Sequence, residues 1–233
     1  MNNKTLYLIP TSLGENYETI PSYVREACLG LNIFIVENLR SARRYLRKIG
    51  FEKDFDTEVI FFELNKHTKE ELEPLYNFLL ESESIGLLSE AGNPCIADPG
   101  AVVVDLCHQL KIQVKPLVGP SSILMALIAS GFNGQNFTFH GYLPIDNLER
   151  TKKLKELENI QRKTDYTQIF METPYRNDKF LESIIKNCRQ ETKLCIAADI
   201  SLETEFIETR TIANWNRDKP KLHKRPAIFI LGN

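Results

Sequence analysis

The sequence lacks the short motifs that mark the commonest nucleotide and hydrolase sites. It contains neither G-x-G-x-x-G nor G-x-x-x-x-G-K-[ST], which argues against an ordinary dinucleotide site and against a P-loop nucleotidase. It has no G-x-S-x-G elbow of the α/β-hydrolase kind. Its 4 histidines show no i, i+4 spacing and no H-E-x-x-H context, so we expect no metal site.

The chain is also poor in cysteine pairs, one-sided charge and long apolar runs. Its 5 cysteines are an odd number without a C-x-x-C pair, so we expect reduced and mostly buried thiols. The 29 Lys and Arg against 31 Asp and Glu give a formal net charge of -2, so any basic site must be local. The apolar run that Pro10 closes is too short for a signal peptide or a membrane span, and we expect a cytoplasmic protein without membrane association.

The first half of the chain alternates short β-rich runs with amphipathic segments, which is typical of a parallel sheet with crossover helices. Strands are expected at 5–9, 32–38, 59–64, 84–90 and 113–118. Helices are expected between Pro21 and Gly30, over about 39–49, through Leu72 to Leu80 after a capping box at Thr68 and Glu71, and after Asp98 and Pro99 as N-cap and first position.

The second half of the chain holds more strands than helices. An apolar helix is expected between Pro120 and Gly131, and a polar surface helix from Asp146 to about Lys163, with Leu148, Leu154, Leu157 and Ile160 near helical spacing. Strands are expected at 137–143, 167–173, 193–200, 205–212 and 225–231, with one strong helix at 174–188. This pattern predicts a mixed sheet, and hence two α/β domains at 1–116 and 117–233.

Three turns rich in small residues follow expected strands. They lie at 10–14, at 89–94 continuing to 96–100, and at 118–122. Open α/β sheets bind ligands outside the carboxyl ends of their strands, and Gly or Pro there lets a ligand approach the backbone. Each turn taken alone is better explained as ordinary turn chemistry, since Gly and Pro occur in most loops.

A basic stripe is expected on the helix over 39–49. Its members are Arg40, Arg43, Arg44 and Arg47, which share one helical face because they are spaced i, i+3, i+4 and i+7. Such a stripe can hold phosphates, or it can be a solvated face paired with acids.

The ordered motifs LYLIPTSLG, SEAGNPCIADPG, VGPSS and METPYR resemble the class III, tetrapyrrole-methylase-type methyltransferases over nearly the whole chain. The likeness is greatest to the branch that methylates a ribose 2'-hydroxyl of a cytidine in small-subunit ribosomal RNA, with patterns such as T-P-I-G-N-L, A-E-D-T-R, S-D-A-G-T-P and E-A-P-H-R. This resemblance implies S-adenosylmethionine as cofactor in the cleft between two α/β domains of the tetrapyrrole methylase type. It also implies RNA of the small ribosomal subunit as substrate, and a homodimer.

The resemblance also assigns site residues. Residues expected around the cofactor are Leu13, Asn93, Ile96, Ser121, Ser122, Met171, Ala198 and Ala227. The candidate bases for deprotonating a ribose hydroxyl are Glu37, Glu172 and Asp98. Arg176 is expected to join the basic stripe in holding substrate phosphates.

The chain departs from the family pattern at Asn38, Tyr175 and Asn93, where the pattern has Asp, His and Thr. These positions are expected to meet the substrate. The sequence also ends at Asn233, where the ribosomal RNA enzymes usually have a further segment thought to help hold RNA, so it resembles a short form. Two alternatives stay open: carbon methylation of a tetrapyrrole such as a porphyrin or corrin, and a non-catalytic protein that binds S-adenosylmethionine or RNA.

Overall fold

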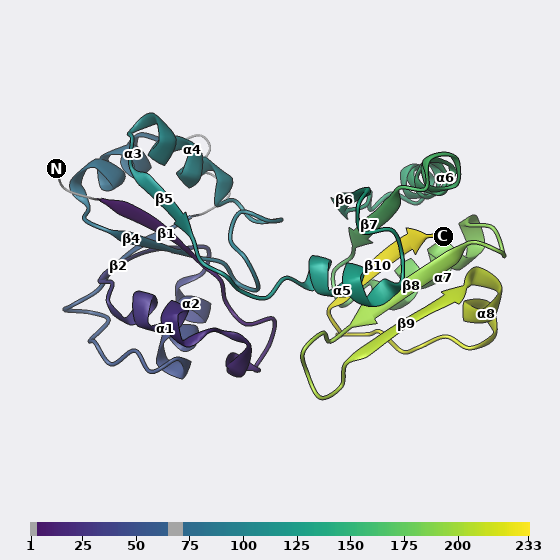
Figure 1. The fold of residues 1–233 in the computed structure, drawn as a ribbon, viewed down its shortest axis with the longest axis horizontal. Helices are drawn as coiled ribbons and strands as arrows, with labels where there is room; N and C mark the ends of the chain where they lie inside the picture. Colours follow the sequence, from purple (N-terminus) through teal and green to yellow (C-terminus); the bar gives the residue numbers. More distant parts are fainter. Residues whose placement is uncertain (1–3, 65–71) are drawn as a thin grey trace. The chain divides into compact units, whose positions relative to one another are not determined.

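The computed structural model describes residues 4–64 and 72–233 of the chain, and Figure 1 labels its elements. The chain divides into two compact units, Met1–Ser121 and Ser122–Asn233. The domain boundary expected from the sequence lay at 116/117. The capping box at Thr68 and Glu71 lies outside the described residues.

Unit 1 is built on a five-stranded, wholly parallel sheet with the strand order β3-β2-β4-β1-β5. Its strands are β1 (Thr5–Ile9), β2 (Ile33–Val36), β3 (Ile60–Glu63), β4 (Ile85–Leu88) and β5 (Gln113–Pro116). The central strand β4 is buried throughout, and a Cβ on its Gly86 would come within 2.7 Å of Ile9 Cδ1. The parallel sheet predicted from the sequence is confirmed.

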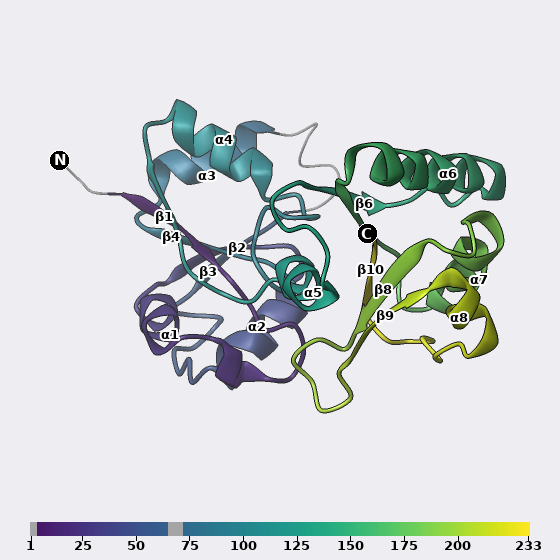
Figure 2. The same ribbon diagram turned by 45° about the vertical axis from the view of Figure 1, so that its right-hand side comes forward.

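Helices cover both faces of this sheet (Figure 2). Helices α1 (Ser22–Leu29) and α2 (Leu39–Lys48) lie on one face, and α3 (Leu72–Glu81) and α4 (Ala101–Gln109) on the other. Each face has its own apolar core, represented by Phe34 and Leu46 on the first and by Leu79 and Val103 on the second. The crossover helices therefore bury the apolar sheet on both sides, as parallel sheets require.

The start of α4 differs from the prediction. Helix α4 begins at Ala101 with Gly100 as its N-cap residue. Asp98 Oδ1 instead accepts hydrogen bonds from the amides of Cys95 and Gly100, both at 2.8 Å. Assigning Asp98 and Pro99 to the N-cap and first helical position was therefore wrong, because the Asp98 side chain closes the preceding turn.

Unit 2 is built on a five-stranded mixed sheet with the order β6-β7-β10-β8-β9. Its strands are β6 (Phe137–Tyr142), β7 (Thr167–Met171), β8 (Lys193–Ala198), β9 (Phe206–Thr211) and β10 (Ala227–Gly232). Strands β6 and β7 are parallel, and the other neighbours are antiparallel. The mixed sheet predicted for the second half is confirmed.

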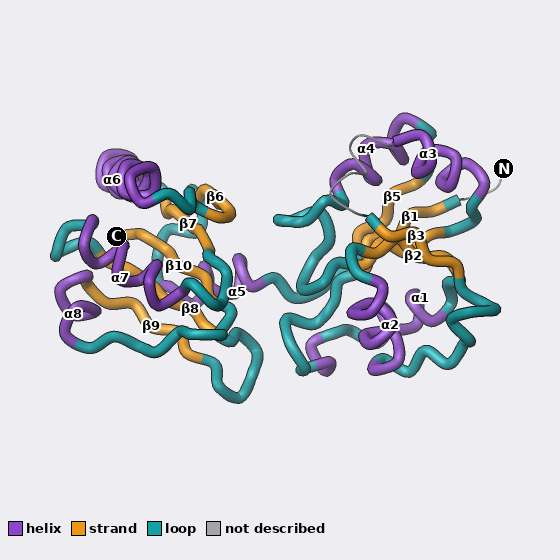
Figure 3. The backbone as a smooth tube through the Cα atoms, turned by 180° about the vertical axis from the view of Figure 1, so that it is seen from behind, coloured by secondary structure: helices purple, strands orange, loops and turns teal. Residues whose placement is uncertain are grey.

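Unit 2 has its helices α5 (Ser122–Ser130), α6 (Asn147–Thr164), α7 (Asn177–Asn187) and α8 (Ile212–Arg217) around this sheet (Figure 3). One core joins the sheet to α6, α7 and α8, and contains Leu154, Phe180 and Trp215. The helix predicted from Asp146 begins at Asn147, with Asp146 as its N-cap residue. Leu148 has the helical spacing of the apolar residues of α6, but it is not buried with them, because it is 82% exposed. The short helix α8 was not predicted from the sequence.

The cysteines agree with the expectation of reduced and mostly buried thiols. All five cysteines are free thiols, and four of them are buried. Within residues 4–64 and 72–233, no group of three His, Cys, Asp or Glu side chains is arranged to hold a metal ion. No helix in these ranges is both long and apolar enough to cross a lipid bilayer.

Candidate functional site

The first two turns singled out in the sequence meet at the carboxyl edge of the unit 1 sheet. Thr11 and Gly92 exchange backbone hydrogen bonds of 2.9 and 3.1 Å as an isolated antiparallel bridge. The Ser89 hydroxyl donates to the Gly92 carbonyl at 2.6 Å, and Thr11 Oγ1 donates to the Ser89 carbonyl at 3.3 Å. These bonds fix the turn after β1 against the turn after β4.

The third turn packs directly on the first. A Cβ on Gly119 would overlap Cβ and Cγ of Pro10, so only glycine fits there. Gly92 has φ +75°, and a Cβ on it would lie 3.3 Å from both the Leu13 side chain and the Pro120 carbonyl oxygen. Glycine is required at both places, by close approach at Gly119 and by backbone conformation at Gly92. The three turns therefore form one surface of small residues.

A cavity of about 220 Å³ opens beside the first two turns and α2. It is lined by Thr11, Ser12, Leu13, Gly14, Glu15, Tyr17, Ser41, Arg44, Tyr45, Ser89, Glu90 and Ala91. Tyr45 donates its hydroxyl hydrogen to the Pro10 carbonyl at 3.1 Å and so ties α2 to the first turn. Leu13, expected at the cofactor, and Arg44, expected at the substrate, thus line the same cavity.

Three carboxylates gather at this edge, namely Glu37 after β2, Glu90 after β4, and Asp98. Burial, together with the negative charges of Asp98 and Glu90, raises the pKa of Glu37 to about 7, against a hydrogen bond from the Glu90 amide that lowers it. Burial also raises the pKa of Asp98, although hydrogen bonds from the Gly100 and Cys95 amides oppose this. A carboxyl group that titrates near neutral pH is suited to general base catalysis.

Glu90 was not among the residues expected from the sequence. Its Oε1 accepts a hydrogen bond of 3.1 Å from the Ser41 hydroxyl at the start of α2, and its charge acts on Glu37. Its position directly after β4 in a turn already singled out was the signal that could have identified it. The side chains of Glu37 and Glu90 come together because their strands are neighbours in the sheet.

The turn that carries Ile96 has an unusual backbone. Cys95 and Ala97 both adopt positive φ angles, of 69° and 62°, which non-glycine residues rarely do. Between them the Ile96 side chain is 47% exposed, and Asn93 nearby is half-buried. Strained backbone of this kind concentrates at ligand sites, which agrees with the expected role of Ile96.

Asn38 has a structural role that the sequence reading did not assign. Its Oδ1 accepts a hydrogen bond of 3.0 Å from the Ser41 amide and caps the N-terminus of α2. Asn and Asp cap helices about equally well, so replacing the Asp of the family pattern keeps this function. The expectation that this position meets the substrate stays a prediction.

Two arginines of the basic stripe are held within unit 1. Arg43 forms an ion pair of 3.0 Å with Asp56, and its guanidinium lies over the Phe55 and Phe61 rings. Arg47 lies 3.9 Å from the Phe55 ring centroid and donates to backbone carbonyls of the loop after α2. These contacts favour a structural role for both residues.

The other two arginines of the stripe face solvent. Arg40 and Arg44 are exposed, and the described part of the chain offers neither of them an ion-pair partner within 4.0 Å. Arg44 also lines the cavity. The structure therefore divides the predicted stripe into a packed pair and an available pair.

In unit 2, three residues expected at the cofactor lie at one end of adjacent strands. Met171 ends β7 and pairs with Ile228 of β10, while Ala227 of β10 pairs with Ala198 at the end of β8. Ala198 and Ala227 are 0% and 7% exposed and belong to the core, and their contact with the cofactor stays a prediction. Two further expected residues, Ser121 and Ser122, are half-buried where α5 begins.

The expected base Glu172 and the expected substrate-binding Arg176 are bonded to each other. Glu172 Oε1 accepts hydrogen bonds of 2.6 Å from Arg176 Nη2 and from the Thr173 amide. The Glu172 side chain is only 2% exposed, against 39% for Arg176. Glu172 is therefore placed to orient the Arg176 guanidinium, and its part as a base stays a prediction.

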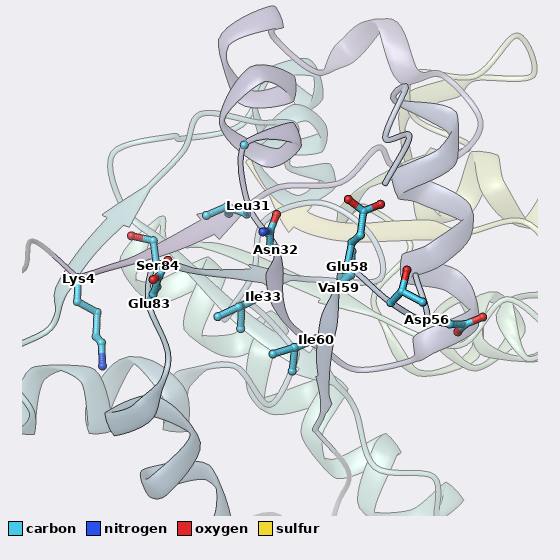
Figure 4. Close-up of a pocket in the computed structure, with 12 residues that line it drawn as sticks. Lys4, Leu31, Asn32, Ile33, Asp56, Glu58, Val59, Ile60, Glu83 and Ser84 are labelled. Carbon is cyan, nitrogen blue, oxygen red and sulfur yellow. The ribbon is translucent and has the colours of Figure 1, made fainter. Parts of the chain in front are cut away.

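A larger hollow of about 660 Å³ lies at the opposite edge of the unit 1 sheet (Figure 4). Its lining includes the residues where strands begin, such as Ile33 and Ile60, and the carboxylates Glu58 and Glu83. Lys4 at its rim donates to two carbonyls at the end of α3, both at 2.7 Å. None of the residues singled out as site candidates lines this hollow.

The chain is similar in sequence to known proteins. The chain is 31% identical to the ribosomal RNA small subunit methyltransferase I of Buchnera aphidicola subsp. Schizaphis graminum, over 98% of this chain and 79% of that protein. It is also 31% identical to the protein of that name from Vibrio cholerae, over 89% of this chain and 69% of the relative. No protein-family model matches the chain.

Solved structures show the same fold at lower sequence identity. The methyltransferase CobJ has a TM-score of 0.64 at 15% identity, covering 98% of this chain and 93% of that chain. Uroporphyrin III C-methyl transferase from Thermus thermophilus has a TM-score of 0.59 at 15% identity, covering 98% and 97%. The expected tetrapyrrole methylase fold is thereby confirmed. With the identity to its relatives, this shows that the chain is a methyltransferase and belongs to the ribosomal RNA small subunit methyltransferase I family.

Proposed function

We propose that the protein transfers a methyl group from S-adenosylmethionine to a ribose 2'-hydroxyl of small-subunit ribosomal RNA. The observation that carries this proposal is Glu37, a half-buried carboxyl group with a pKa of about 7 at the carboxyl edge of the unit 1 sheet. The names of the relatives support the choice of RNA, because each is called a ribosomal RNA small subunit methyltransferase.

The small-residue turns fit a cofactor that lies against the backbone. A Cβ at Gly119 would overlap Pro10, and a Cβ at Gly92 would lie 3.3 Å from Leu13 and from the Pro120 carbonyl oxygen, so both glycines let the turns pack closely together. We propose that Leu13, Asn93 and Ile96 of unit 1 hold S-adenosylmethionine. The proposed contacts in unit 2, together with the serines at the boundary, are Ser121, Ser122, Met171, Ala198 and Ala227.

In the proposed reaction Glu37 acts as the base. When bound, S-adenosylmethionine supplies an electrophilic methyl group on a positively charged sulfur. The Glu37 carboxylate would accept the proton of the ribose hydroxyl as that oxygen takes the methyl group from the cofactor, which would leave as a neutral thioether. Burial, and then the negative charges of Asp98 and Glu90, raise the pKa of Glu37. The chain's remaining task is to align the two reactants and exclude water.

Arg40 and Arg44 are the proposed contacts to substrate phosphates in unit 1. Both are exposed on α2, which begins directly after Glu37 and Asn38. Lys and Arg contacts to phosphates supply much of the affinity of proteins for nucleic acids. Arg43 and Arg47, which stack on Phe55, are left with the structural role of holding α2 in place.

The two alternatives from the sequence gain little from these observations. The likeness to a uroporphyrin enzyme is at 15% identity and concerns the fold alone. The departure at Asn38, which motivated a non-catalytic role, is accounted for by helix capping. We also expect a homodimer in the cytoplasm, as the resemblance implies, and light scattering of the purified protein would test the dimer.

The test uses purified protein, radiolabelled S-adenosylmethionine and small ribosomal subunits from a strain lacking this protein. We expect label in the ribosomal RNA, and resistance of the adjacent phosphodiester to alkali, because a methylated 2'-oxygen cannot attack it. Glu37→Gln should lower the rate at least about 100-fold. Glu52→Gln, which removes an exposed carboxylate elsewhere in unit 1, is the matched control. Cofactor binding by calorimetry without any label in RNA would overturn the assignment of substrate.

A further inference from the structure

An exposed aromatic pair stands on the surface of unit 2. Tyr175 follows β7 and is 71% exposed. Its ring meets the ring of His223 edge to face, with centroids 6.0 Å apart and an interplanar angle of 76°. His223, which precedes β10, is exposed as well. Two exposed rings held against each other present flat apolar surface to solvent.

Hydrogen bonds join the two loops that carry these rings. The Lys224 amide donates to the Pro174 carbonyl at 2.9 Å, and the Leu222 amide donates to Asp178 Oδ1 at 2.7 Å. The side chain of Asn177, itself fully buried, donates to the Arg225 carbonyl at 2.7 Å. The rings therefore stand on a preorganised base, so that little conformational entropy is lost when a ligand binds.

The charge around the pair is positive. The segment 219–225, KPKLHKR, has four Lys or Arg residues and no carboxylate. Arg225 is neutralised by an ion pair of 2.6 Å with Asp199. Lys221 and Lys224 are exposed, and among the described residues no carboxylate lies within ion-pair distance of either side chain. Two cations thus flank the rings without local neutralisation.

We propose that Tyr175 and His223, with Lys221 and Lys224, form a platform for one unpaired nucleotide of an RNA strand. The base stacks on the exposed aromatic surface and the lysines contact its phosphates. Base stacking on aromatic side chains beside Lys or Arg is the common chemistry of single-strand recognition, whereas a paired base has no free face. This platform deepens the proposed function, since it assigns to unit 2 a part in recognising the RNA.

Fluorescence anisotropy with an end-labelled single-stranded RNA of about 12 nucleotides, and with the same sequence as a duplex, tests the platform. We expect Tyr175→Ala to raise the Kd for the single strand at least about fivefold and to leave the Kd for the duplex unchanged. Tyr175→Phe should bind as the parent does, because stacking needs only the ring. Tyr166→Ala, which removes another exposed tyrosine of unit 2, is the matched control. Lys221→Gln should reduce the salt dependence of single-strand binding by about 0.7 of a logarithmic unit per decade.

Equal affinities of Tyr175→Ala and Tyr166→Ala for the single strand would refute the platform, as would equal losses on single strand and duplex. Loss of binding to intact small subunits without loss on free RNA would also refute it, and would indicate a protein contact instead. Methyl transfer by the parent protein decides the proposed function separately. A parent that labels ribosomal RNA together with an unaffected Tyr175→Ala rejects the platform alone.

Discussion

The raised pKa of Glu37 makes the folded protein less stable when this residue is charged. A carboxyl group whose pKa is about 7 in the folded state and 4.5 as the unperturbed value binds its proton more tightly when folded. The free energy of unfolding therefore falls as the pH rises from about 4.5 to about 7. Glu37→Gln, which cannot ionise, should remove this loss.

The size of the stabilisation expected for Glu37→Gln follows from the pKa shift of Glu37. A change from 4.5 to about 7 corresponds to about 3 kcal/mol if fully expressed. Glu37 is only half-buried and solvent screens part of the interaction, so we expect Glu37→Gln to stabilise unit 1 by about 1 to 2 kcal/mol at about pH 8. The gain should be much smaller at about pH 5, where the folded parent already holds the proton.

Urea unfolding followed by circular dichroism measures this difference, with Glu52→Gln as the control at both pH values. Trp215, the only tryptophan, is buried in unit 2 and gives a separate fluorescence signal for that unit. We expect Glu37→Gln to be more stable than the parent at the higher pH and to have lost methyl transfer. If the stabilisation of Glu37→Gln relative to the parent were no larger at about pH 8 than at about pH 5, the reasoning about Glu37 would be refuted.

Three further outcomes are expected. Glu90→Gln removes one negative charge that raises the pKa of Glu37, so the rise of the methylation rate with pH should move to lower pH. A pH–rate profile measures this, and an unmoved profile would contradict it. Gly119→Ala forces a Cβ into Pro10 and should lower the stability of unit 1 by about 1 to 3 kcal/mol in urea unfolding, whereas an unchanged midpoint would mean that the turns separate freely. Arg44→Glu should weaken RNA binding and its salt dependence without changing the melting temperature, and unchanged RNA affinity would remove Arg44 from the substrate site.

The sequence predicted the sheets because apolar runs are local and periodic. The composition of the site could not be predicted in the same way, because it depends on which residues remote in the chain lie close together in the fold. Glu90 joins Glu37 only because β2 and β4 are neighbours in the sheet, which no local pattern reveals. The spacing of Arg43 predicted an exposed side chain available to a substrate. Nothing in its own helix indicates that its guanidinium lies over the Phe55 ring. Asp98 followed by Pro99 matches the pattern of an N-cap. The prediction failed because Asp before Pro also begins other turns.

The order of strands in unit 1 has a consequence for how the chain folds. Strand β1 comes first in the sequence, yet its two partners come much later, since Leu6 pairs with Ile85 on one side and with Val114 on the other. During synthesis the first strand must therefore wait, without backbone partners, until β4 and then β5 have left the ribosome. Pairings so distant in sequence form slowly. Unit 1 thus completes its sheet only when nearly all of its own residues have been made, just before unit 2 begins to emerge.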